Sequence, residues 1–431
     1  MTQSEIKEAS ETQTTPVLSP SERLLARFSR VTSGGKIIPE FEGVRTYGIF
    51  MVILIHMAIN LNIKYSETYP FPDTDSLLSA FFQISWHAVE LFFLISGFIL
   101  ACPFIASVQK GRPIKLRNYY IRRLTRIEPP YLVCLVLVFI LMVLGNRGTI
   151  SELLPHLGAS LLYMHNLTFS EHSLINNVAW SLEVEVQFYL LVPLFALMFR
   201  IKNVTIRRGL MLAIAIVANT YSWLNIAEGD RLYLSIVRFL HFFMMGFLLA
   251  DIYLNDWKTK LERHWKWDIV TFVGWPVMIV IWITPEWSDA ISTAGKAPIL
   301  DIFGYPVFMF LFYYCGVLRG VLTSKILSNV WVTTIGGMSY TLYLFHNKII
   351  SIMIEYTGGF VPTTEYFLNL VFQIVLVVPV ILVFSAIYFL LVERPCMRQN
   401  WPQTLWDFVT FRTSASKEKD LSKSVSVTNQ V

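Results

Sequence analysis

Arg45 and His56 are two ionisable residues in an otherwise apolar stretch of the sequence. They are 11 residues apart, so on a helix they share one face and are separated by about 16 Å along the axis. A guanidinium at one end of this face can hold a phosphate, and an imidazole further along can exchange a proton near neutral pH. The pair suits a donor with a phosphate head and a long, thin arm, which is the shape of a coenzyme A thioester. For Arg45 alone, snorkelling to a membrane interface is an equally good interpretation.

Other charged and histidine residues also occupy apolar segments, where ionisable groups are costly and usually mark a functional interior. Counted from the predicted cytoplasmic end of each segment, they fall at about 12 to 16 residues, which places them in one layer near the middle of a bilayer. We therefore expect one polar cavity, with ion pairs that fix helix packing as the alternative. The residues are His56, Glu90, Glu183, Glu185, Arg238, His241, His346 and Lys348.

The densest basic stretch, KGRPIKLRNYYIRRLTR at 110–126, carries seven positive charges. Such clusters bind phosphates or anionic lipid headgroups. The simpler interpretation is a loop that sets topology at the membrane surface. The more specific one makes Arg123 and Arg126 phosphate ligands at the mouth of the cavity. Because they are three residues apart, they are neighbours if the following helix begins early.

The elements that must position these residues are membrane-spanning helices. Of the 431 residues, 54% are hydrophobic and only 15% are charged, whereas soluble proteins have about 25% charged residues. A span needs about 20 mostly apolar residues. The shorter stretch 151–167 is predicted to be an interfacial helix, with an eleventh span as the alternative. We predict an all-α integral membrane protein with ten transmembrane helices in one bundle, at 44–62, 82–102, 128–145, 180–199, 209–226, 233–254, 268–283, 300–319, 333–354 and 367–392.

The distribution of basic residues predicts the orientation. With ten spans, both termini lie on one side, and that side holds 28 of the 35 lysines and arginines, whereas the opposite loops hold 4. Cytoplasmic loops are enriched in Lys and Arg, so both termini are expected to be cytoplasmic. We expect a polar, disordered tail at 1–40, a membrane domain at 41–396 and a C-terminal tail at 397–431. The first apolar segment is expected to act as an uncleaved anchor, since 1–40 has no apolar core of a signal peptide.

The four cysteines predict neither a disulfide framework nor a metal site. Cys102, Cys134, Cys315 and Cys396 are scattered, and no Cys-x-x-Cys or Cys/His ligand spacing occurs. We expect them to be inert, and we expect no metal and no permanently bound cofactor.

Six strings in order resemble acyltransferase family 3, a family of polytopic membrane O-acyltransferases. The resemblance runs from about 41 to 396. The strings are the Arg-x10-His pattern of Arg45 and His56, VELFFLISGF at 89–98, RRLTRIEPPY at 122–131, WSLEVEVQFYLLVP at 180–193, SYTLYLFH at 339–346 and VERP at 392–395.

The resemblance implies about ten helices, an acyl-CoA donor from the cytoplasm, with acetyl-CoA as the family-level default, and a carbohydrate acceptor on the far side. By resemblance, the catalytic residues are His56, Glu90 and Glu185, with Glu185 selected over Glu183. The residues that bind the donor phosphates are Arg45, Arg123 and Arg126. Tyr343, His346 and Trp180 are expected to bind substrate. Some relatives carry a fused extracytoplasmic hydrolase-like domain, which is absent from this sequence, so a second transfer would need a separate partner.

Two chemical routes and two other functions stay open. His56 acts either as general base on the acceptor hydroxyl or as the nucleophile of an acyl-imidazole, with Glu90 or Glu185 orienting its ring. Ser96 lacks the first glycine of a nucleophile elbow, and Ser96–Gly97 is predicted to be a close helix-packing point. A proton-coupled transporter and a non-catalytic scaffold are the alternatives.

The partners are defined only by class. The acceptor candidates are lipopolysaccharide O-antigen, another cell-envelope glycan or a small glycosylated metabolite. By resemblance, the membrane is a bacterial cytoplasmic membrane. No nucleic-acid partner is expected, and the oligomeric state stays open.

Overall fold

The computed structural model describes residues 28, 30, 38–68, 81–82, 85, 87–257, 261–283, 300–360, 365–397 and 401. Every regular element in these ranges is a helix, as predicted. The predicted tails at 1–40 and 397–431 lie mostly outside the described residues.

Six helical segments of the described part are long and apolar enough to cross a membrane. They contain α3 (Pro39–Tyr65), α5 (Ala88–Lys110), α6 (Leu116–Leu144), α9 (Trp180–Phe195), α11 (Ile236–Asn255) and α20 (Tyr366–Tyr388). The other four predicted spans coincide with α10 (Val204–Asn225), α13 (Gly274–Ile283), α16 (Tyr305–Leu311) and α19 (Ser339–Thr357). The chain is therefore a multi-pass membrane protein, while ten spans and cytoplasmic termini stay predictions.

Several helix boundaries differ from the sequence prediction, most of all at the third span. The third helix begins at Leu116 rather than 128, so most of the basic stretch at 110–126 is helical and not a loop. Leu124 and Ile121 interleave with the arginines, which gives this segment an apolar face despite its charge. The stretch 151–167 forms α7 (Ile150–Leu161), which starts at a capping box between Thr149 and Glu152, and the short α8 (His165–Phe169).

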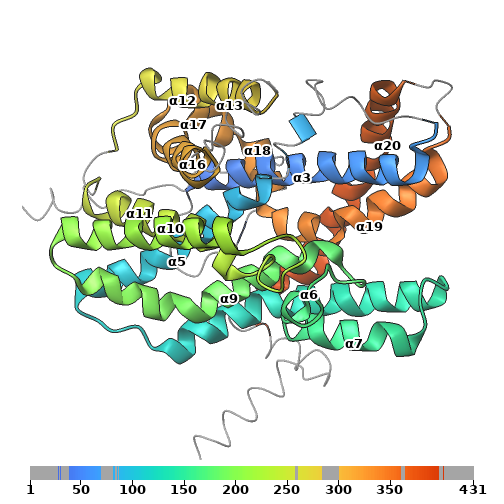
Figure 1. The fold of residues 1–431 in the computed structure, drawn as a ribbon, viewed down its shortest axis with the longest axis horizontal. Coiled ribbons are helices and arrows are strands. Elements are labelled where there is room, and N and C mark those ends of the chain that lie inside the picture. Colours follow the sequence, from blue (N-terminus) through green and yellow to red (C-terminus); the bar gives the residue numbers. More distant parts are fainter. Residues whose placement is uncertain are drawn as a thin grey trace, which may run out of the picture.

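The helices pack in two groups that meet where α3 contacts α5 (Figure 1). One group places α5 against α11, with α10 on the far side of α11. The other places α3 beside α19 and α18 (Val330–Gly337), with α20 packed against α19 and also in contact with α3. Helix α3 contacts members of both groups and so connects them.

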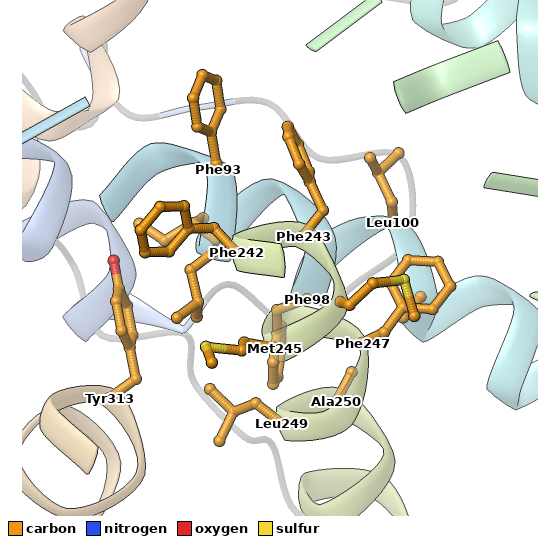
Figure 2. Packing of buried hydrophobic residues seen from close by; sticks show 14 of the residues in the cluster. Phe93, Phe98, Leu100, Phe242, Phe243, Met245, Phe247, Leu249, Ala250 and Tyr313 are labelled. Carbon is orange, nitrogen blue, oxygen red and sulfur yellow. The ribbon is translucent and has the colours of Figure 1, made fainter. Parts of the chain in front are cut away.

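Contact between α5 and α11 is the most extensive helix interface described. Phe93, Phe98, Phe243 and Phe247 interdigitate there (Figure 2). Two glycines permit the approach: a Cβ on Gly97 would lie 2.3 Å from the Phe243 carbonyl oxygen, and one on Gly246 would lie 2.3 Å from that of Leu94. The prediction that Ser96–Gly97 is a close packing point is confirmed for Gly97.

We expect Gly246→Val to force α5 and α11 apart and to destabilise the protein by about 1–3 kcal/mol or more, because the added atoms meet rigid backbone. The measurement is the thermal unfolding midpoint in detergent. Gly209→Ala in α10 is the matched control, since nothing lies within 4 Å of its Cβ position and alanine favours helix by about 1 kcal/mol. Equal midpoints for Gly246→Val and the unchanged protein would contradict this packing.

Candidate active site

Two cavities of about 90 and 100 Å³ lie where α3, α5, α6, α9 and α19 meet. They share six lining residues and so form one continuous site, which we call the arginine cavity. The shared residues are Arg30, Arg45, Ser96, Leu182, Glu185 and Tyr340. Arg123, Arg126 and Glu393 line the first cavity only, and Val52 and Tyr343 line the second only.

The three arginines predicted to bind phosphate all line this cavity. Arg45 follows the start of α3 by two turns. Arg123 and Arg126 lie one turn apart on α6, because this helix begins early enough to include both. Their side chains therefore converge from two helices, as the sequence spacing required.

The guanidinium groups have fewer acceptors than they need. Arg45 Nη1 donates to Glu42 Oε1. Arg123 lies 6.0 Å from the ring centroid of Tyr119 and 5.8 Å from that of Tyr189, and within the described residues it forms no ion pair. Arg126 Nη2 is buried without a hydrogen-bond partner in the described structure. Buried donors without acceptors are costly, so the arrangement favours an anion in the cavity.

Glu185 is a carboxylate that lines both parts of the arginine cavity. It accepts hydrogen bonds from the Ser96 hydroxyl and, at 2.6 Å, from the Tyr189 hydroxyl. Glu183 faces elsewhere and accepts from the backbone N–H groups of His165 (3.2 Å) and Asn166 (2.9 Å). Glu185 is therefore placed for the site, whereas Glu183 holds the loop before α9.

His56 and His346 form a pair just beyond the cavity. Their ring centroids are 4.9 Å apart in an edge-to-face arrangement. His56 Nδ1 lies 2.8 Å from the Val52 carbonyl, and Val52 lines the cavity one turn before His56. His346 Nδ1 faces the carbonyls of Leu342 (3.0 Å) and Tyr343 (2.9 Å). Both rings thus donate from Nδ1 and carry the lone pair on Nε2.

Backbone carbonyls orient these imidazoles, and no described carboxylate lies within hydrogen-bond distance of either ring. This differs from the sequence prediction, in which Glu90 or Glu185 orients the His56 ring. The physical reason for the difference is local: a helical side chain points back toward the preceding turn, where carbonyl oxygens are available.

A chain of amides continues from the histidine pair. Asn60, one turn after His56, donates to Asn347 Oδ1 at 2.9 Å, and Asn347 donates to Asn177 Oδ1 at 2.8 Å. Asn347 directly follows His346 on α19. Amide side chains both donate and accept, which is the chemistry that recognises hydroxyl groups.

Of the remaining predicted residues, Glu90 and Trp180 lie apart from the arginine cavity, whereas Tyr343 lines it. Glu90, in the first turn of α5, contacts His87 Nδ1 at 3.0 Å. Trp180 packs against Phe93 and Phe239. Tyr343 lines the cavity, where it accepts from Ser181 at 3.0 Å and donates to the Val178 carbonyl.

The predicted single layer of ionisable residues divides into separate sites. Only Glu185 among those eight residues lines the arginine cavity. Arg238 lies over the Tyr233 ring at 4.0 Å, and Lys348 Nζ lies 3.4 Å from the Leu174 carbonyl. Depth counted along a sequence does not fix which face of its helix a residue occupies or how far that helix tilts. The prediction that these residues share one cavity is therefore wrong.

Several lining residues were not predicted. Ser96 had been interpreted only through its neighbour Gly97, and Tyr189 carried no signal beyond its place in α9. Glu393 lies in the VERP string and accepts from the backbone and the hydroxyl of Thr341, so that string could have identified it. Arg30 belongs to the polar tail, where no pattern marks it.

The comparisons with known proteins assign the chain to a family. A family described as "Acyltransferase domain" matches residues 38–390. The chain belongs to acyltransferase family 3. This match includes Arg45, His56, Arg123, Arg126, Glu185 and His346.

Two curated relatives illustrate the similarity. The O-acetyltransferase OatA of Staphylococcus aureus is 26% identical over 357 residues, which are 78% of this chain and 54% of the relative. The peptidoglycan O-acetyltransferase OatA of Listeria monocytogenes is 23% identical over 438 residues, which are 94% of this chain and 62% of the relative. The chain thus spans little more than half the length of the relatives it matches. No solved structure matches it.

Pyrophosphate should bind the arginine cavity and raise the unfolding temperature of the purified protein at constant ionic strength. At 100 times the dissociation constant, the expected stabilisation is about 2.7 kcal/mol. Arg126→Gln should lose most of it, because its guanidinium then no longer faces the anion. Arg200→Gln, which changes an exposed arginine outside the cavity, should behave like the unchanged protein. Equal stabilisation of the Arg126 and Arg200 variants would rule out this site.

Proposed function

We propose that the chain is a membrane-bound O-acyltransferase, moving an acetyl group from acetyl-CoA to a hydroxyl of a cell-envelope glycan. The observation that carries the proposal is the arrangement on α3. This one continuous helix places Arg45 in a cavity that can bind an anion, and it places His56 about 16 Å further along its axis. A phosphate head and a reactive thioester at the two ends of a thin arm match that separation.

In this proposal the donor phosphates bind Arg45, Arg123 and Arg126. Guanidinium groups suit phosphate because their parallel N–H donors bind two oxygens at once. The pantetheine arm then runs along the second cavity past Val52 and Tyr343, whose positions lead toward the histidine pair. The route ends one helical turn short of His56, where the thioester carbonyl would lie.

His56 then acts as general base. Its Nε2 lone pair removes the proton from the acceptor hydroxyl, the hydroxyl oxygen attacks the thioester carbonyl carbon, and the carbon–sulfur bond breaks to release coenzyme A as a thiolate. The proton on His56 passes to that thiolate, so the imidazole returns to its neutral form. The acyl-imidazole route uses the same nitrogen as nucleophile and differs in its covalent intermediate.

The acceptor is proposed to enter past Asn60, Asn347 and Asn177. Their side-chain hydrogen bonds connect α3, α19 and the segment before α9, and they begin where the histidine pair ends. His346 Nε2, buried without a described partner, can accept a hydrogen bond from a second hydroxyl of the sugar. The relatives named O-acetyltransferase, one of them for peptidoglycan, support an envelope glycan in a bacterial cytoplasmic membrane.

The test is release of free coenzyme A from acetyl-CoA by detergent-purified protein with membrane extract as acceptor. His56→Ala should lower turnover about 10²–10⁴-fold and still be stabilised by coenzyme A. Arg45→Ala should lose that stabilisation, because it removes a phosphate ligand. His264→Ala changes an exposed histidine outside the site and serves as the matched control.

Lack of both turnover and coenzyme A stabilisation in the unchanged protein would contradict the proposal. Transport assays would then test the proton-coupled transporter, the alternative that uses the same ionisable residues. Full activity of His56→Ala would instead overturn only the catalytic role proposed for His56.

A further inference from the structure

The tail residues 28 and 30 pack against the cytoplasmic mouth predicted for the arginine cavity. The Phe28 ring stacks on that of Phe389 with centroids 6.4 Å apart, next to Met338. A Cβ on Gly337 would lie 2.6 Å from the Phe28 carbonyl oxygen, so glycine at this position allows the tail to approach the start of α19. Two residues later, Arg30 lines both parts of the cavity.

The Arg30 guanidinium is incompletely paired. Its Nη1 lies 3.7 Å from Glu42 Oε1, the same oxygen that accepts from Arg45. Its Nε is buried without a hydrogen-bond partner in the described structure, and only 15% of the side chain is exposed. Burial, together with the neighbouring charges of Arg126 and Arg45, lowers the pKa of Arg30 to about 9. It therefore stays charged at neutral pH but is held among like charges.

An ion pair that only anchors the tail is the simpler explanation for Arg30. It would leave two features unexplained: the 3.7 Å separation is too long for a hydrogen bond, and Arg126 Nη2 on the other wall is also without a partner. One oxygen of each carboxylate around the cavity already accepts a hydrogen bond, in Glu42 from Arg45, in Glu185 from Ser96 and Tyr189, and in Glu393 from Thr341. In the described structure none of these carboxylates forms a hydrogen bond with Arg30 or Arg126, although Glu42 Oε2 is also without a partner. A phosphate group would satisfy the free donors on both walls and offset the clustered positive charge.

We propose that Arg30 is a further phosphate ligand of the donor site, brought there by the N-terminal tail. This inference rests on the proposed function, because it takes the anion to be the phosphates of a coenzyme A donor. Arg30 precedes the family match, which begins at residue 38. Arg30 thus adds a fourth guanidinium to the three supplied by the membrane helices.

The test is the affinity of the full-length protein for coenzyme A in a maltoside detergent, which has no phosphate, at several NaCl concentrations. Arg30→Gln keeps the length and polarity of the side chain and removes its charge. We expect about 10-fold weaker binding or more, and a smaller loss of affinity with salt because one charged phosphate contact is gone. Arg200→Gln is the matched control, and Arg126→Gln is the comparison within the cavity. Arg30→Lys, which keeps the charge, should fall between Arg30→Gln and the unchanged protein and preserves the test if Arg30→Gln fails to fold.

Three outcomes would overturn the inference while leaving the proposed function intact. Arg30→Gln could match Arg200→Gln while Arg126→Gln is weaker, which would reduce Arg30 to a tail anchor. Arg30→Gln could bind coenzyme A more tightly, which would make Arg30 an obstruction. It could bind coenzyme A normally but lose affinity for a short-chain phosphatidylglycerol titrated in parallel, which would assign Arg30 to a lipid headgroup. If the unchanged protein does not bind coenzyme A, the proposed function fails together with the inference.

Discussion

Guanidinium groups gathered in a buried cavity repel one another and need acceptors that the chain only partly supplies. In this protein Glu42 Oε1 accepts from Arg45 and lies 3.7 Å from Arg30, and two buried N–H donors, on Arg30 and Arg126, have no described partner. Leaving such donors unpaired costs about 1–3 kcal/mol or more each. A stable fold can carry this cost when a ligand offsets it, and the surrounding helices are arranged so that an anion can do so.

The rest of the architecture follows from holding this cavity at a fixed distance from the histidine pair. Helix α3 is the spacer, because Arg45 and His56 lie on one face of the same rigid element. The close packing of α5 on α11, permitted by Gly97 and Gly246, fixes Ser96 and through it Glu185. On the other side, α19 places Tyr343 and His346 one turn apart, which connects the cavity wall to the second imidazole.

Much of this site could be predicted from the sequence, and the reasons for the remainder are physical. The Arg45–His56 spacing and the Arg123–Arg126 spacing are local helical periodicities. The prediction from the Arg123–Arg126 spacing therefore holds although α6 begins twelve residues earlier than predicted. The positions of Glu90 and Trp180 depend on helix tilt and rotation, which no local pattern encodes. Ser96 and Arg30 depend on contacts across long sequence separations, and Arg30 lies in a tail whose composition gives no periodic signal.

The central claim is that phosphate binding and acyl transfer occur at opposite ends of one α3-based site. The most direct measurement compares kcat/KM for acetyl-CoA and for acetyl-pantetheine, which lacks the donor phosphates, in Arg126→Gln and His56→Ala. We predict that Arg126→Gln loses about 10-fold or more with acetyl-CoA and is unchanged with acetyl-pantetheine, whereas His56→Ala loses activity with both. A parallel loss with both substrates in Arg126→Gln would contradict this division of roles.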